Sequence, residues 1–113
     1  MSERDDRTSL EDMRAHAREA IAMLGSKDQK DLLQNRMMQL ALTRLVEIIG
    51  EAANRVSAET QGQCPRIPWS EIIGMRNRMT HGYDSLDLEI LFDTVAHDLP
   101  NLVSMLDEIL DGR

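Results

Sequence analysis

The feature that most constrains the fold of this chain is a long stretch without proline. No proline interrupts the sequence between about Lys27 and Cys64, and Ser26 followed by Gln29 is a helix-capping pattern. The spacing therefore predicts one helix from about Lys27 to about Glu59. At about 1.5 Å per residue this helix would be about 50 Å long, which is more than a small globule covers unaided.

Apolar residues of this predicted helix form two neighbouring stripes. A helix that is apolar over so broad an arc buries one side in its own core and favours burial of the other against a second copy of the chain. Gly50 lies inside it at a cost of about 1 kcal/mol, which indicates close approach of another helix or a kink. We therefore expect a homodimer that pairs through this long second helix. The stripes contain Leu33, Met37, Leu40, Leu45, Ile48, Ala52 and Val56 on one side and Met38, Leu42, Val46, Ile49 and Ala53 on the other.

The remaining apolar patterns are helical as well. One helix is expected from the capping pair Thr8 and Glu11 to Gly25. Another begins after the cap residue Asp87, and Pro100 kinks or divides it. There are no strand patterns and no internal repeats, so the predicted fold is all-α.

The predicted architecture is a four- to five-helix up-down bundle that forms a single domain over residues 1–113. Residues 60–67 are rich in helix breakers and are expected to form a loop. Trp69, which follows this loop, is interpreted as a packing anchor.

Composition limits the functions open to this chain. Its formal net charge of −7 argues against a protein that coats nucleic acid, because that mode needs a basic face. A small site that grips one or two phosphates with a few Arg residues remains compatible. No apolar run reaches the roughly 20 residues of a membrane span, and the polar start is unlike a secretory signal, so we expect a cytoplasmic protein. The single cysteine, Cys64, lacks companions for a disulfide or a metal site, and no metal or cofactor is expected.

Chemically useful side chains are concentrated in residues 76–83, which read Arg-Asn-Arg-Met-Thr-His-Gly-Tyr. Pro68 and Gly82 predict the start and the end of a helix, which places this group at a helix C-terminus. Arg76 lies within the apolar arc of that helix, whereas Arg78 points the opposite way. An Arg in that arc either pairs with a carboxylate from another helix or lines a cleft that admits an anion. For an Arg considered alone, the structural ion pair is the favoured interpretation.

Two further residues bear on the role of Arg76. Glu51 is a candidate for the carboxylate that meets it, and the equally weighted alternative is an ordinary solvated charge. His81 lies about 140° round from Arg76 in an ideal helix, so the two share a face only if the last turn unwinds, which Gly82 permits. The partial negative charge at a helix C-terminus favours the imidazolium and would poise His81 to exchange protons near neutral pH.

Arg76, Asn77 and His81 resemble the motif of the HEPN superfamily, whose ribonuclease members carry an Arg, a polar residue beside it and a His separated from the Arg by four to six residues. With Tyr83 the pattern becomes Arg-x4-His-x-Tyr, which is similar to that of the HepT-type toxins. The flanking segments that also resemble this family are residues 48–52, 67–69 and 98–100.

The resemblance implies the toxin component of a toxin–antitoxin system, a metal-independent endoribonuclease. In that chemistry an RNA 2′-hydroxyl attacks the adjacent phosphorus, which requires a proton acceptor and donor and a cation for the developing charge. His81 would act as acid or base and Arg76 as the phosphate clamp. Asn77 would orient the phosphate or His81, with Glu51 in a supporting role, and a dimer would bring two such sets into one cleft.

The resemblance also implies a partner. In HepT-type systems the antitoxin is a minimal, MntA-like nucleotidyltransferase that adenylylates the motif tyrosine, here Tyr83. Phosphates added there would compete with RNA for Arg76 and His81. The alternative is a non-catalytic HEPN module that binds a nucleotide or a partner protein through the same two residues, and nothing in the sequence decides between these functions.

Overall fold

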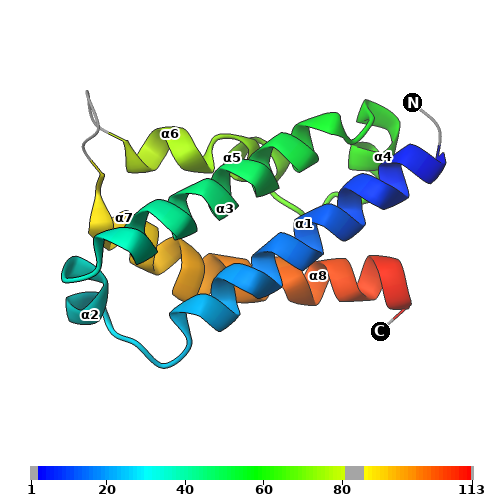
Figure 1. The fold of residues 1–113 in the computed structure, drawn as a ribbon. Coiled ribbons are helices and arrows are strands. Elements are labelled where there is room, and N and C mark those ends of the chain that lie inside the picture. Colours follow the sequence, from blue (N-terminus) through cyan, green and yellow to red (C-terminus); the bar gives the residue numbers. More distant parts are fainter. Residues whose placement is uncertain (1–2, 81–85, 113) are drawn as a thin grey trace.

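The computed structural model describes residues 3–80 and 86–112, and helices account for most of these ranges (Figure 1). The only pairing of extended backbone within them is an isolated antiparallel bridge between Thr80 and Leu86. The predicted all-α class is therefore confirmed. No helix in the described ranges is both long and apolar enough to cross a membrane. The elements are α1 (Glu3–Leu24), α2 (Gln29–Leu33), α3 (Arg36–Arg55), α4 (Ala58–Gln63), α5 (Trp69–Ile73), α6 (Met75–Met79), α7 (Leu88–Asp93), the π-helical segment η1 (Thr94–Asp98) and α8 (Leu99–Asp111).

The core lies between three long elements. Helix α1 packs against both α3 and α8, and α5 and α6 pack against α3 at the upper edge of the bundle in Figure 1. Both termini lie at one end of the molecule, and α2 lies at the other. Side chains that are fully buried here include Met13 of α1, Leu42 and Ile49 of α3, and Leu102 and Leu106 of α8.

The single long helix expected from about Lys27 to about Glu59 is wrong, because the chain forms three helices over this stretch. Asn35 caps α3 by accepting a hydrogen bond from the backbone N–H of Met38, and Ser57 caps α4 in the same way. Short polar side chains that bond to nearby backbone groups offer the chain an alternative to a continuous helix. The 20 residues of α3 are therefore only about 30 Å long.

Two predicted helix starts are also corrected. Helix α1 begins at Glu3, before the expected capping pair at Thr8, and Asp6 in its first turns accepts hydrogen bonds from Ser57 and Thr60 at the start of α4. At α2 the capping box is formed by Asp28 and Asp31, whose side chains each accept a hydrogen bond from the other's backbone N–H. The predicted pair that starts at Ser26 lies too early in the sequence.

Close approach of another helix at Gly50 is confirmed. A Cβ atom at this position would lie 3.2 Å from the carbonyl oxygens of both Ile72 and Ile73 in α5. The absence of a side chain therefore lets α3 and α5 lie almost in backbone contact. This contact fixes where the segment after α5 begins relative to α3.

The helix expected to start at Pro68 and end at Gly82 is divided. Gly74, with φ −91° and ψ 3°, separates α5 from α6, and α6 ends at Met79. The loop expected at residues 60–67 is shorter than predicted, because α4 continues to Gln63.

The packing role of Trp69 is confirmed. Its indole N–H donates to the carbonyl oxygens of Gln61 and Cys64, each at 3.1 Å, and its ring packs against the core. These bonds hold the start of α5 against the end of α4.

The C-terminal element follows the prediction closely. Asp87 caps α7 by accepting from the backbone N–H of Ile90, and the chain is divided just before Pro100. Because proline has no N–H to donate, the helix widens into the π-helical turns of η1 before α8 continues.

Only part of one predicted apolar stripe remains outside the core. Leu45, Ala52 and Val56 of that stripe are buried within this chain. Leu33, Met37 and Leu40 are exposed to 55%, 82% and 49%. We refer to these three residues as the apolar patch.

Candidate functional site

An open recess of about 190 Å³ lies between α3 and the α5–α6 segment. Its walls bring together three residues predicted from the sequence, Arg76, Asn77 and Glu51. The close contact at Gly50 forms its floor, since it sets α5 and α6 directly against α3. The full lining consists of Val46, Glu47, Gly50, Glu51, Asn54, Ile73, Arg76 and Asn77. We refer to it as the Arg76 recess.

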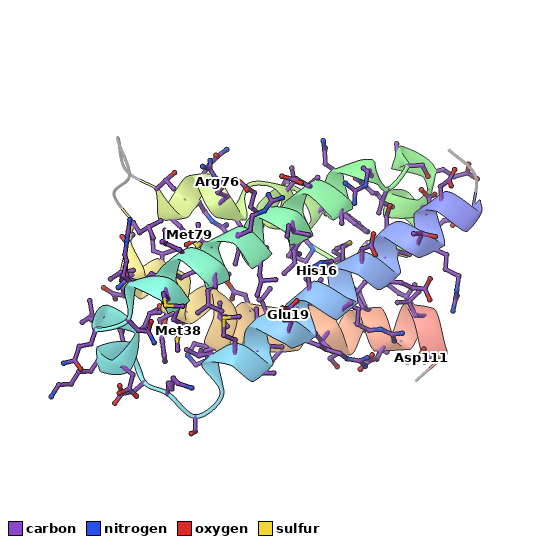
Figure 2. All side chains as sticks on the ribbon, in the orientation of Figure 1. His16, Glu19, Met38, Arg76, Met79 and Asp111 are labelled. Carbon is purple, nitrogen blue, oxygen red and sulfur yellow. The ribbon has the colours of Figure 1, made fainter. Side chains whose placement is uncertain are left out.

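Arg76 is both paired and accessible. Its Nε lies 2.6 Å from Oε2 of Glu47, and its side chain remains 49% exposed. Figure 2 shows Arg76 on α6 near the upper surface and Met79, one turn later, lying toward α3. The expectation that Arg76 lies in the apolar arc is wrong, because the break at Gly74 changes the helical phase between α5 and α6.

Both sequence interpretations of Arg76 therefore describe part of what is observed. It forms an ion pair with a carboxylate of another helix, and it lines a recess that is open to solvent. Within residues 3–80 and 86–112, Glu47 is the carboxylate that pairs with this guanidinium, and it approaches from the Nε side. Both terminal amino groups are left for an acceptor from outside the described part of the chain.

The carboxylate that meets Arg76 belongs to Glu47, so the pairing proposed for Glu51 is wrong. Glu51 instead lies 3.4 Å from Nη1 of Arg44. The same Arg44 nitrogen lies 2.5 Å from Oε1 of Glu47. Glu51, Arg44, Glu47 and Arg76 thus form one continuous chain of alternating charges along the recess.

A partial signal for Glu47 is present in the sequence. It lies one turn before Glu51 on the same polar edge of α3, so periodicity makes the two equivalent. Which of them meets Arg76 depends on which turn of α3 faces α6, and the contact at Gly50 decides that. The hydrogen bond from Arg44 to Glu47, with Glu51 nearby, raises the pKa of the Arg44 guanidinium above its ordinary value, which keeps it charged.

Two other expected features can be placed. Arg78 is exposed, as expected of a surface charge, and lines a groove between the α5–α6 segment and α8. Asn77, also exposed, lies beside Arg76 at the rim of the recess. His81 and Tyr83, together with Gly82, lie outside the described residues.

The residues on either side of this segment are held together. Thr80 and Leu86 form an antiparallel bridge, and the backbone N–H of Asp87 donates to the carbonyl of Met79 at 2.6 Å. The backbone at the end of α6 therefore lies beside the backbone that enters α7.

The remaining titratable groups do not gather into a second site. In the described ranges, no three His, Cys, Asp or Glu side chains lie close enough to hold a metal ion. His16 donates through its ring to the carbonyl of Asp12 at 2.7 Å, and His97 lies edge-on to Phe92. Burial raises the pKa of the Cys64 thiol.

An all-helical domain that presents an accessible Arg beside an Asn at an open recess, with a His five residues after the Arg, has the features of a HEPN-type ribonuclease. Comparison with known proteins agrees. Residues 13–109 match the family model described as "Ribonuclease HepT-like". The chain belongs to the HepT-like ribonuclease family.

Individual relatives support the same family assignment. The Methanocaldococcus jannaschii protein named "Putative RNase MJ1380" is 32% identical over 102 residues, which cover 90% of this chain and 94% of the relative. The Thermococcus cleftensis protein named "Probable ribonuclease HepT" is 34% identical over 80 residues, which cover 71% of this chain and 73% of the relative. No solved structure gives a significant match.

Proposed function

We propose that this chain is the toxin of a toxin–antitoxin system and cleaves RNA without a metal ion, using Arg76 and His81. One observation carries the assignment. Arg76 is paired with Glu47 through its Nε at the rim of an open recess, beside Asn77, and its terminal amino groups meet no acceptor in residues 3–80 and 86–112. A guanidinium presented in this way suits bidentate contact with a phosphate.

The proposed reaction is an intramolecular transesterification. The 2′-oxygen attacks the adjacent phosphorus, a bond between them forms, and the bond from phosphorus to the 5′-oxygen breaks. One group accepts the proton of the 2′-hydroxyl and another donates a proton to the departing 5′-oxygen. His81 serves in one of these roles, and Arg76 stabilises the charge that develops on the phosphoryl oxygens.

A second copy of the chain is part of this proposal, because one histidine cannot hold both roles at once. The apolar patch on α2 and α3 lies at the end of the molecule at which α6 ends and from which residue 80 leads to His81 (Figure 1). A partner seated on this patch would bring two Arg76 and His81 sets to one region. Glu51, which lines the recess, remains a candidate supporting residue through its contact with Arg44.

The test is cleavage of RNA by the purified protein, with and without a chelator. We expect Arg76→Ala and His81→Ala each to lower the cleavage rate by at least about 100-fold, as is typical for loss of an acid–base group or an oxyanion contact. Arg78→Ala is the matched control, because it removes an exposed Arg from the same helix without touching the Arg76 recess.

Three outcomes would contradict the assignment. His81→Ala could cleave like the parent, or Arg76→Ala could simply unfold, which circular dichroism would reveal. A parent protein that binds RNA but never cleaves it would favour a non-catalytic HEPN module.

We further propose that Tyr83 is the site at which a nucleotidyltransferase antitoxin neutralises the toxin. The phenolic oxygen would attack the α-phosphorus of ATP, forming an O–P bond, losing its proton and releasing pyrophosphate. Intact-mass spectrometry after co-expression with a neighbouring nucleotidyltransferase should show an addition the size of one or more AMP units. The addition should be absent from Tyr83→Phe. An unmodified Tyr83 in a fully inhibited complex would mean that the partner acts by occlusion alone.

A further inference from the structure

The carboxylate of Glu47 contacts two guanidinium groups at once. Oε2 lies 2.6 Å from Nε of Arg76, and Oε1 lies 2.5 Å from Nη1 of Arg44. Both oxygens are thus engaged, one with Arg76 of α6 and the other with Arg44, three residues earlier in α3. Glu47 is 29% exposed, compared with 49% for Arg76 and 59% for Arg44, so it is the most covered of the three.

The atom of Arg76 that Glu47 uses decides what remains available. A guanidinium presents donors along two edges, and the edge formed by its two terminal amino groups matches the paired oxygens of a phosphate. Glu47 takes Nε with a single oxygen. Among the described residues no acceptor meets the terminal edge of Arg76, which is therefore available to a ligand, while the ion pair with Glu47 restrains the direction of the side chain.

A half-exposed Arg without such a partner samples many rotamers. Ordering it when substrate binds would cost conformational entropy, and a misplaced cation stabilises the transition state poorly. Arg44 occupies the second oxygen of Glu47 and so prevents the carboxylate from rotating away from Arg76. In this arrangement Arg76 is the phosphate-binding group, Glu47 orients Arg76, and Arg44 holds Glu47 in place.

We propose that Glu47 is a positioning residue that orients Arg76 toward an RNA phosphodiester, and that Arg44 holds Glu47 in place. The inference rests on the proposed ribonuclease function. It assigns no proton transfer to Glu47. The opposite interpretation is that Glu47 masks Arg76 by competing with phosphate, and the two predict changes of opposite sign.

The experiment compares Glu47→Ala and Glu47→Gln with the parent. Gln keeps a side-chain oxygen at the same position along the side chain but carries no charge, whereas Ala keeps neither the oxygen nor the charge. Glu108→Ala is the matched control, because Glu108 forms an equally short 2.6 Å ion pair with Arg66 on exposed surface away from the Arg76 recess. We expect kcat/KM for RNA cleavage to fall about 10- to 100-fold in Glu47→Ala, and Glu47→Gln to recover part of the loss. Glu108→Ala should stay within about twofold of the parent, in line with the small energetic weight of exposed ion pairs.

Three further readouts separate positioning from a structural role. The Nε–H resonance of Arg76, assigned by its loss in Arg76→Lys, should be protected from exchange in the parent and exchange faster in Glu47→Ala. Affinity for a 2′-O-methyl oligonucleotide, which cannot be cleaved, should fall in Glu47→Ala. The shape of the pH–rate profile should not change, because Glu47 transfers no proton.

Each other outcome has a definite meaning. Tighter oligonucleotide binding or faster cleavage in Glu47→Gln would establish masking and overturn the inference. Parent-like cleavage and binding in Glu47→Ala would also overturn it, while leaving the proposed function intact. If the parent itself cleaves no RNA, the proposed function fails, and oligonucleotide binding that does not depend on Glu47 would then overturn the positioning role separately.

Discussion

At the scale of single residues, one buried charge outside the lining of the Arg76 recess bears on stability. Asp6 in α1 is 4% exposed, and its carboxylate accepts three hydrogen bonds. The donors are the backbone N–H and the hydroxyl of Ser57, at 3.0 and 2.6 Å, and the hydroxyl of Thr60, at 2.6 Å. These bonds, that of the Ser57 hydroxyl first and that of Thr60 next, lower the pKa of Asp6 below its ordinary value. They also tie the start of α1 to the start of α4.

This arrangement predicts an acid-dependent loss of stability. Because the pKa of Asp6 is lower in the folded than in the unfolded chain, its stabilisation is present above the unfolded value of about 3.9 and disappears as pH falls toward the folded value. We expect Asp6→Asn to lower Tm at pH 7. The difference in Tm between parent and variant should shrink as pH falls below about 4.

Thermal unfolding followed by circular dichroism between pH 3 and 7 measures this difference. The matched control is Asp12→Asn in the same helix, whose ion pair with Arg55 is long, at 3.9 Å, and exposed. Its effect on Tm should be small at every pH. A difference for Asp6→Asn that is constant across the range would show that ionisation of Asp6 contributes nothing.

At the scale of elements, the contact between α3 and α5 controls the geometry of the recess. Gly50 is the position that permits it, since a Cβ there would press on two backbone carbonyls rather than on side chains that could turn aside. The α5–α6 segment carries Arg76, and α3 carries Glu47. The distance between those two side chains therefore depends on how closely the helices approach.

Gly50→Ala tests this dependence. Alanine gains about 1 kcal/mol in helix propensity, but overpacking against backbone typically costs about 1–3 kcal/mol, so we expect a net loss of up to about 2 kcal/mol. RNA cleavage should fall more than stability alone explains, because α6 shifts relative to α3. Urea unfolding and cleavage rates measured on the same preparations provide the comparison.

The chain contains a control for this substitution. Gly62 lies in α4, and nothing lies within 4 Å of a Cβ atom built there. Gly62→Ala should be neutral or stabilise by up to about 1 kcal/mol. If Gly50→Ala behaves in the same way, the close approach of α3 and α5 has no energetic consequence.

At the scale of the whole molecule, the apolar patch predicts self-association. Exposure of 82% of a side chain as large as Met37, together with the exposed Leu33 and Leu40, is unfavourable for an isolated acidic protein in water. We expect sedimentation at micromolar concentration to give about twice the chain mass of 12.9 kDa. The double variant Met37→Glu and Leu40→Glu should sediment as a monomer with unchanged helical content.

The control for this prediction is Ile109→Glu, which alters an exposed apolar residue of α8 outside the patch. That variant should remain dimeric. A parent protein that sediments as a monomer under these conditions would remove the dimer and, with it, the two-copy arrangement of the proposed cleft.

The sequence by itself determined the helical class, the final helix with its division at Pro100 and the anchoring of Trp69, whereas at Gly50 it left close approach of another helix and a kink as alternatives. The features that it determined follow from local chemistry, because a cap, a missing N–H or an amphipathic ring acts over only a few residues. The motif around Arg76 was equally readable, because it is a property of eight consecutive residues. The contributions of His81 and Tyr83 remain predictions.

Only the tertiary structure decided where the long helix breaks and which carboxylate meets Arg76. Periodicity allowed a continuous helix from about Lys27 to about Glu59, but Asn35 and Ser57 gain capping bonds, and Ser57 is held by Asp6 from 51 positions away. Glu47 and Glu51 are equivalent by spacing, and the register between α3 and α6 selects Glu47. The sequence alone could not predict the helix breaks or the carboxylate that pairs with Arg76. Each depends on groups that are distant in the chain and become neighbours only on folding.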